Sequence, residues 1–153
     1  DQNMLRVLIV CLGIICMSPL AEGIQRSKVD SKEVFIDSAG TGSWHIGHPP
    51  DSRSVRVAAN YDIDISTQRG RQFTTGDFEK FDRIFVMDRD NLSTVLEMAQ
   101  NEEQRNKVEL LLNMAYPGMN REVPDPYHEG ADAFEAVFKM LDEACEILCK
   151  NLK

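Results

Sequence analysis

The sequence predicts an α/β fold, a three-layer sandwich in which helices cover both faces of a four-stranded parallel sheet. Two observations predict it: four short apolar runs have the length and composition of buried strands, and the segments between them carry the apolar spacing of helices. No internal repeat or low-complexity linker interrupts this alternation. The chain has 153 residues, 42% of them hydrophobic and 27% charged, which is typical of a globular domain with its own core. We therefore expect a single domain over residues 1–153.

The expected strands and helices alternate along the chain. Strands are expected at 6–10, 34–36, 83–87 and 108–112. Helices are expected at 19–29, 49–59 and 91–99, with a helical turn at 76–78. Ser18 can cap the first helix, and Pro19 fits its first turn. A long final helix is expected from apolar residues at helical spacing, namely Phe134, Val137, Phe138, Leu141, Cys145 and Leu148.

Charge and cysteine content exclude several classes of protein. The net charge of −8 and the isoelectric point near 4.9 argue against a nucleic acid or an anionic membrane surface as partner, because both require a cationic face. The four cysteines, Cys11, Cys16, Cys145 and Cys149, do not form the pattern of a disulfide framework or of a zinc site. We expect a cytoplasmic protein with reduced thiols and without a metal or other cofactor.

The N-terminal apolar stretch has a second interpretation. Arg6, the apolar residues 7–17 and the small residues that follow resemble the parts of a secretory signal peptide. The stretch is too short to span a bilayer. We favour its interpretation as the first strand and loop of the domain.

A cysteine and a glycine follow the first strand, in a loop that leads into the first helix. Ligands of parallel sheets bind beyond the carboxyl ends of the strands, and the backbone N–H groups of such a loop can hold a dianion and favour a thiolate. Cys11 is therefore a candidate nucleophile, although an isolated cysteine after a strand can also be purely structural. The loop that would surround it consists of Leu12, Gly13, Ile14, Ile15, Cys16, Met17 and Ser18.

Residues 10–19 read V-C-L-G-I-I-C-M-S-P and resemble the catalytic loop V-C-L-G-N-I-C-R-S-P of the low-molecular-weight protein tyrosine phosphatases. Three other segments follow in the family's order: D-S-A-G-T at 37–41, G-x-P-P-D at 47–51 and D-P-Y at 125–127. The resemblance covers essentially the whole chain. It implies that family's fold and its reaction, the hydrolysis of phosphotyrosine monoesters through a phosphocysteine intermediate. The ligand that it implies is a phosphotyrosine-containing or related peptide.

The resemblance also implies roles for residues outside the loop. Asp125 would protonate the leaving phenolic oxygen and then activate water, a role that suits a carboxyl group kept partly dry by neighbouring prolines and an aromatic ring. Trp44 and Tyr127 would form the rim of a cleft for a phenyl ring. Cys11 and Cys16 have the spacing that permits a reversible disulfide in the family. Without the resemblance, Asp125 would be interpreted as a turn residue and Trp44 as a core residue.

Three departures from the family pattern fall on one site. Met17 stands in place of the loop arginine, Ile14 in place of the loop asparagine, and Gln68 in place of the histidine linked to that asparagine. The arginine is a planar fork that grips phosphoryl oxygens and stabilises charge in the transition state. We therefore expect catalysis to be severely impaired or absent. Loss of both polar partners also suggests a loop with a different, more apolar packing.

Two alternatives remain open at this point. The chain could be an active phosphatase in which Arg53, Arg69 or Arg71 replaces the missing guanidinium. It could instead be a non-catalytic protein that binds a peptide in the cleft beside Trp44 and Tyr127. An arsenate reductase is disfavoured, because that activity relies on the same loop arginine.

Overall fold

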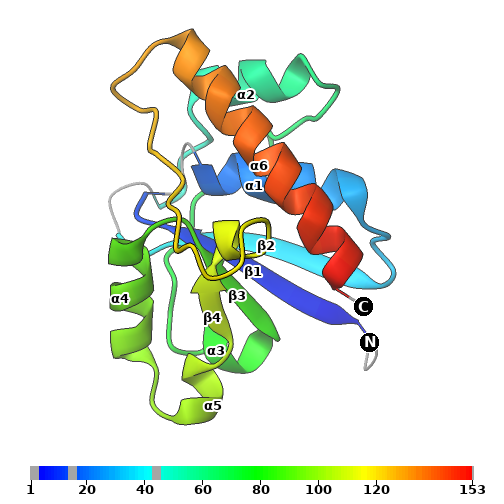
Figure 1. Cartoon of the computed structure of the whole chain (residues 1–153). Helices are drawn as coiled ribbons and strands as arrows, with labels where there is room; N and C mark the ends of the chain where they lie inside the picture. The colour runs from blue at the N-terminus through cyan, green and yellow to red at the C-terminus, as the bar shows by residue number, and fades with distance from the viewer. Residues whose placement is uncertain (1–3, 14–16, 43–45, 153) are drawn as a thin grey trace.

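Four parallel strands form the centre of the molecule. The computed structural model describes residues 4–13, 17–42 and 46–152. The strands are β1 (Leu5–Cys11), β2 (Val34–Gly40), β3 (Arg83–Val86) and β4 (Val108–Leu110), and they lie in the order β2-β1-β3-β4. The predicted four-stranded parallel sheet is confirmed (Figure 1).

Helices cover both faces of the sheet and complete the three layers (Figure 1). On one face, α1 (Met17–Lys28), α2 (Ser52–Ala59) and α6 (Ala131–Asn151) pack against each other and, through α1, against β1 and β2. On the other face lie α3 (Asp77–Lys80) and α4 (Arg89–Met98), followed by the short α5 (Glu102–Arg105). The sequence did not predict α5, which is only four residues long.

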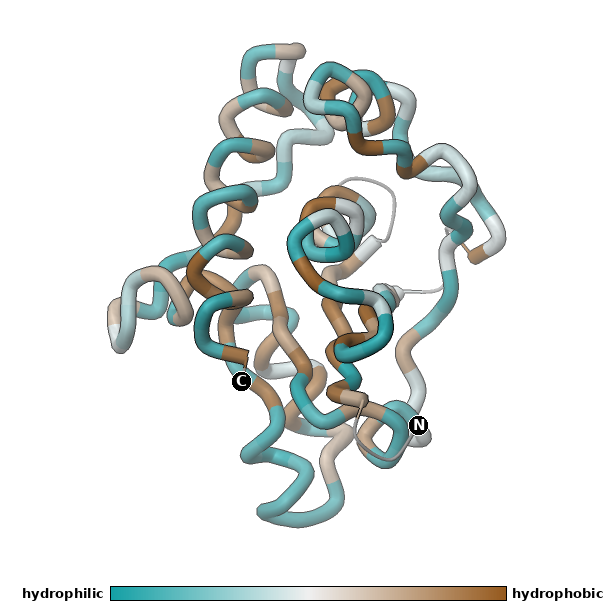
Figure 2. The backbone as a smooth tube through the Cα atoms, turned by 90° about the vertical axis from the view of Figure 1, so that its right-hand side faces the viewer, coloured by the Kyte–Doolittle hydropathy of each residue, from teal (hydrophilic) through white to brown (hydrophobic). Residues whose placement is uncertain are grey.

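Alternate residues of β1 supply two separate cores, because successive side chains of a strand point to opposite faces. Val7, Ile9 and Cys11 belong to the core under α1 and α6. Leu8 and Val10 belong to the core under α3 and α4. Figure 2 shows hydrophilic and hydrophobic positions alternating along the surrounding helices, as expected for helices with one buried face. The side chain of Cys11 is thereby directed to the α1 face.

Two strand ends differ from the sequence-based expectation. β2 continues beyond residue 36 because its polar residues find partners: Asp37 pairs with Arg71, and the Ser38 hydroxyl donates to Glu22 at 2.5 Å. The fourth strand ends at Leu110, and a 3₁₀ helix (Leu111–Asn113) follows it. Its leucines are buried, and periodicity alone does not distinguish such a turn from a buried strand.

The strand order determines where a site can form. The chain leaves β1 for β2 on one side and later returns to β3 on the other side of β1. The loops after β1 and β3 therefore diverge, and ligands of open parallel sheets bind at such a point, beyond the carboxyl ends of the strands. Cys11, the last residue of β1, lies at this point.

Candidate active site

Cys11 is fully buried, and its sulfur contacts the loop that follows it. It is a free thiol. Its Sγ donates to the Gly13 carbonyl oxygen at 2.7 Å and lies 3.1 Å from the Ser18 hydroxyl in the first turn of α1. Thr41 N–H donates to the Cys11 carbonyl, which joins the end of β1 to the loop after β2. A backbone carbonyl, rather than an N–H group, therefore faces the sulfur from residue 13.

This environment favours the thiol over the thiolate. Burial raises the pKa of Cys11 to about 11, and the hydrogen bonds from Ser18 offset this only in part. The carboxylates of Asp125 and Asp88 are close enough to raise it further. The sequence had indicated a thiolate held by N–H groups. In the described part of the loop, the Ser18 backbone N–H bonds to the sulfur and lowers the pKa, whereas Gly13 presents its carbonyl oxygen. Residues 14–16 lie outside the described residues, so the expected nest of N–H groups remains a prediction.

Met17 is the first residue of α1, and its side chain is turned into the protein. It is 5% exposed and belongs to the core under α1 and α6. At this position the flexible apolar side chain of Met17 fills space in the core. It carries no positive charge that could face a bound anion. Ile14, Ile15 and Cys16 lie outside the described residues, so their predicted places in the loop remain predictions. The disulfide between Cys11 and Cys16 that the family resemblance permits stays untested, and Cys11 is a free thiol in the structure.

Gln68 still contacts the start of α1. Its Nε2 donates to the Pro19 carbonyl at 3.2 Å. Its Oε1 is buried and has no hydrogen-bond partner among the described residues. The Nε2 atom of Gln68 thus ties the segment around residue 68 to α1, whereas its Oε1 atom is left without a hydrogen bond in the described part of the chain.

Asn91 and Asp88 hold the loop from the opposite side, and the sequence analysis had assigned them no role. The Asp88 carboxylate caps α4 by accepting from Asn91 N–H at 2.8 Å. With its amide oriented to satisfy both neighbours, the buried Asn91 donates to Asp88 and accepts from Leu12 N–H, each at 3.2 Å. The D-x-x-N spacing predicts the helix cap, but no signal in the sequence predicts the bond to Leu12.

Asp125 lies in the segment between η1 (Leu111–Asn113) and α6. Val123 N–H donates to the Met87 carbonyl, which ties this segment to the end of β3. Asp125 is exposed, not partly dry as expected, and its Oδ1 accepts from Tyr127 N–H at 3.0 Å. The charge of Asp125 contributes to raising the pKa of Cys11, so the two predicted catalytic residues lie near enough to interact electrostatically.

Arg53 fastens the Asp125 segment to α2. Its guanidinium forms two hydrogen bonds with the Asp51 carboxylate and donates to the Glu129 carbonyl at 3.1 Å. It also lies 4.4 Å from the centre of the Phe134 ring and 5.5 Å from that of Tyr127. Arg53 therefore positions Tyr127, one predicted residue of the rim. Trp44, the other, lies outside the described residues.

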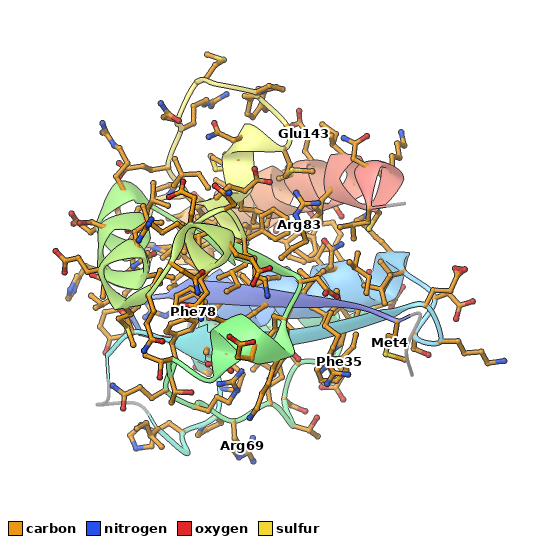
Figure 3. The ribbon with its side chains drawn as sticks, turned by 90° about the horizontal axis from the view of Figure 1, so that it is seen from below. Met4, Phe35, Arg69, Phe78, Arg83 and Glu143 are labelled. Atoms are coloured by element: carbon orange, nitrogen blue, oxygen red, sulfur yellow. The ribbon has the colours of Figure 1, made fainter. Side chains whose placement is uncertain are left out.

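The other two candidate arginines are held away from the sulfur. Arg71 contacts Asp37 and forms a pair of hydrogen bonds with the buried carboxylate of Asp77. Arg69 is exposed and donates to the carbonyls of Ser66 and Gln68 in its own loop. Figure 3 shows Arg69 projecting outward from this loop, below Phe35 and Phe78.

Within residues 4–13, 17–42 and 46–152, no three His, Cys, Asp or Glu side chains are grouped so that they could hold a metal ion. No helix in this part of the chain is long and apolar enough to cross a membrane.

Comparison with known proteins identifies the family. Residues 6–153 match the family model for low molecular weight phosphotyrosine protein phosphatases. The chain is 37% identical over 153 residues to the low molecular weight phosphotyrosine protein phosphatase of Schizosaccharomyces pombe, covering 97% of each chain. It is 34% identical to the phosphatase YfkJ of Bacillus subtilis, covering 98% of this chain and 97% of YfkJ. The chain belongs to the low molecular weight phosphotyrosine protein phosphatase family.

Solved structures of low molecular weight phosphatases share the fold. A protein tyrosine phosphatase from Entamoeba histolytica, with Hepes in its active site, superimposes with a TM-score of 0.90 at 34% identity, covering 97% of this chain and 96% of the other. Wzb of Vibrio vulnificus, in complex with benzylphosphonate, gives a TM-score of 0.87 at 27% identity, covering 97% and 99%. The predicted family and fold are confirmed. The roles of Cys11 and Asp125 in this chain remain predictions.

Proposed function

We propose that this family member hydrolyses phosphotyrosine monoesters very slowly or not at all. The observation that carries the proposal is the buried thioether of Met17 at the position of the loop arginine. A thioether has no charge and no hydrogen-bond donor, so it cannot hold the equatorial oxygens of a phosphoryl group in the transition state. Loss of one comparable donor costs about 10²–10³ in rate, and affinity for phosphate falls with it.

The surroundings of the Cys11 sulfur support the same conclusion. A thiolate at Cys11 would lie 2.7 Å from the Gly13 carbonyl oxygen. The negative charges of Asp125 and Asp88 would also repel it. All three disfavour an anion, and the thiolate is the nucleophilic form of cysteine. An incoming phosphate dianion would meet the same groups. The Gly13 carbonyl and the two carboxylates therefore disfavour both the thiolate nucleophile and the phosphate dianion of the family's reaction.

A displaced arginine is the less favoured alternative. The side chains of Arg53, Arg69 and Arg71 each take part in the hydrogen bonds described above. Delivering one of them to Cys11 would break these bonds. For Arg71 it would also leave the buried carboxylate of Asp77 without its positively charged partner. Leaving a buried charge unpaired costs about 3–5 kcal/mol.

The test is the turnover of p-nitrophenyl phosphate by the parent and by four variants. These are Met17→Arg, Ile14→Asn, the double variant and Cys11→Ser. We expect the parent to turn over at least 100-fold more slowly than YfkJ of Bacillus subtilis, which serves as the reference, because it lacks one transition-state donor. A parent rate within tenfold of YfkJ, abolished by Cys11→Ser, would contradict the proposal, and Arg53 would then be the first arginine to replace.

The same variants distinguish a missing charge from a repacked loop. If the loop has repacked around Ile14 and Gln68, Met17→Arg alone places a guanidinium against apolar surroundings and recovers little activity. We then expect the double variant to exceed the sum of the two single effects, as coupled sites do. Full recovery of turnover by Met17→Arg alone would show that the site lacks only the arginine side chain.

A further inference from the structure

A cavity lies where β1 and β2 begin, at the end of the sheet opposite to Cys11. Its volume is about 640 Å³, and small-molecule sites in proteins have volumes of about 300–1,000 Å³. Leu5 and Val34, the first residues of the two strands, pair with each other and line it. Cys11 is the seventh residue of β1, so at about 3.3 Å per residue it lies about 20 Å from Leu5. The cavity is therefore separate from the candidate active site.

Apolar side chains form much of the cavity wall. They come from the starts of the two strands and from the residues that directly follow α1 and α6, and they are Leu5, Val34, Val29 and Leu152. Figure 1 shows that β1 begins at the same end of the molecule as that at which α6 ends. All four side chains are partly buried against the core under α1 and α6. Their exposed parts offer an apolar surface to a ligand.

Five charged side chains also line the cavity, and two of them neutralise each other. Lys28 forms an ion pair with Glu146 at 3.0 Å. The other three, Asp30, Glu33 and Lys150, form no ion pair within the described residues. Two carboxylates and one ammonium group leave a surplus of one negative charge, in a chain whose net charge is −8. The cavity therefore attracts a cationic group and repels an anion.

The two unpaired carboxylates belong to one turn, which joins α1 to β2. Glu33 N–H donates to the Asp30 carbonyl at 2.9 Å, and the Glu33 carbonyl accepts from Leu5 N–H at 2.9 Å. Oδ1 of Asp30 accepts from Lys32 N–H at 2.9 Å. Within the described part of the chain, Oδ2 of Asp30 and both carboxylate oxygens of Glu33 accept no hydrogen bond. Backbone hydrogen bonds thus hold the turn beside the apolar wall, and its carboxylates are available to a donor.

We propose that this cavity binds a small primary amine that carries an apolar body. The ammonium group lies beside Asp30 and Glu33, because its three donors match carboxylate oxygens that accept no other bond. The apolar body lies against Leu5, Val34 and Leu152, where it leaves water. The side chain of a lysine from another protein has the same charge but is too slender to fill about 640 Å³, so the occupant is a free amine with a larger body. Binding here does not depend on the proposed weak catalysis, because the residues that line the cavity take no part in the candidate active site.

The experiment measures the affinity of the full chain for four probes by ¹H–¹⁵N NMR titration at pH 7.5. 4-Phenylbutylamine has the proposed charge and body, 4-phenylbutanol lacks the charge, 4-phenylbutyrate inverts it, and n-butylamine lacks the ring. We expect 4-phenylbutylamine to bind about tenfold more tightly than 4-phenylbutyrate, and at least about threefold more tightly than the other two probes. The largest shift changes are expected in residues 28–34 and 146–152.

Three protein variants locate the binding. Glu33→Gln and Leu152→Ala are expected to weaken 4-phenylbutylamine at least about threefold, because they remove a charge at the ammonium group and part of the apolar wall. Glu103→Gln is the matched control for charge: it removes one carboxylate from α5, which directly precedes β4 at the sheet edge opposite β2. It should change the affinity less than about 1.5-fold. The unfolding midpoint of each variant verifies that it is folded.

Cys149 provides a local readout of occupancy. Its free, half-buried thiol lines the cavity and accepts from Nε2 of Gln25 at 3.2 Å, whereas Cys11 and Cys145 are fully buried. We expect saturating 4-phenylbutylamine, which remains protonated at pH 8.5, to slow the alkylation of Cys149 by iodoacetamide at least fivefold at that pH. The same concentration of 4-phenylbutyrate should leave the rate unchanged. Fragment mass spectra separate Cys149 from Cys145.

Several results would overturn the inference. Equal affinity for 4-phenylbutylamine and 4-phenylbutyrate would exclude recognition of the charge, and equal affinity for n-butylamine would reduce the interaction to charge attraction. Shift changes centred outside residues 28–34 and 146–152 would place the binding elsewhere. The absence of measurable binding, or parental affinity in both Glu33→Gln and Leu152→Ala, would also contradict it. Turnover of p-nitrophenyl phosphate by the parent tests the proposed function separately from all of these results.

Discussion

Met17 and the arginine that it replaces differ in what each can do in the first turn of a helix. An arginine there has to keep its head group beside Cys11, where an anion can reach it. The thioether instead turns into the core under α1 and α6, and burying a methionine side chain contributes about 1.5–3 kcal/mol. Burial of the Met17 side chain therefore stabilises the fold locally, and moving it out to the solvent would lose that contribution.

Cys11 provides the prediction at this scale. With its pKa raised to about 11 by burial, about one molecule in ten thousand carries the thiolate at pH 7. We expect the rate of its alkylation by iodoacetamide, followed by mass spectrometry of the peptide that contains Cys11, to rise tenfold per pH unit up to at least pH 9.5. In Asp125→Asn the rate at a given pH should be higher, because one nearby negative charge is gone. A rate that levels off below pH 8 would show that the loop holds a thiolate after all.

At the scale of elements, the close approach of α1 to the segment 63–68 sets the position of Gln68. A Cβ atom on Gly23 would lie 2.4 Å from Cγ2 of Ile65 and 3.1 Å from Cγ2 of Ile63. Only a glycine lets the two elements come this near. The bond from Gln68 to the Pro19 carbonyl depends on this contact, so the packing of α1 and the support of the loop are linked.

Gly23→Ala tests that packing. We expect it to destabilise the protein by about 1–3 kcal/mol, because overpacking forces Ile65 or α1 to move, and this exceeds the gain of up to about 1 kcal/mol in helix propensity. Gly76→Ala is the control, since Gly76 has a helical backbone and only Thr74 Oγ1 near its added methyl group, at 3.7 Å. Urea unfolding of the parent and both variants gives the comparison. Equal midpoints for all three would show that α1 can shift without cost.

At the scale of the whole molecule, the sequence predicted the sheet and its layers because apolar runs and helical spacing are local signals. Val7 to Val10 read as a buried strand and are one. The site was predicted less completely, because its geometry depends on contacts between segments far apart in the chain. The bond between Asn91 and Leu12 joins α4 to the first loop, and the stacking of Arg53 on Phe134 joins α2 to α6. No local pattern contains either contact, or the direction of the Gly13 carbonyl.

The surplus of negative charge acts on the whole molecule and leads to the last prediction. The chain has 25 acidic and 17 basic side chains, which gives a net charge of −8 at pH 7. Such a surplus repels itself most strongly in the compact folded state, and salt screens this repulsion. Salt also screens the exposed ion pairs, such as those of Lys28 with Asp142 and Glu146, but each of these contributes only about 0–1 kcal/mol.

We therefore expect 0.5 M NaCl to raise the urea midpoint of the parent at pH 7.5. At pH 5, close to the isoelectric point of about 4.9, protonated carboxyl groups and histidines leave almost no net charge to screen, and the gain should largely disappear. Urea unfolding at both pH values, with and without NaCl, measures the two gains under otherwise identical conditions. An equal gain at both pH values would mean that salt acts through apolar surface, which it also helps to bury. A lower midpoint in salt at pH 7.5 would mean that the ion pairs outweigh the repulsion, and that the negative surplus is held in favourable pairings across the fold.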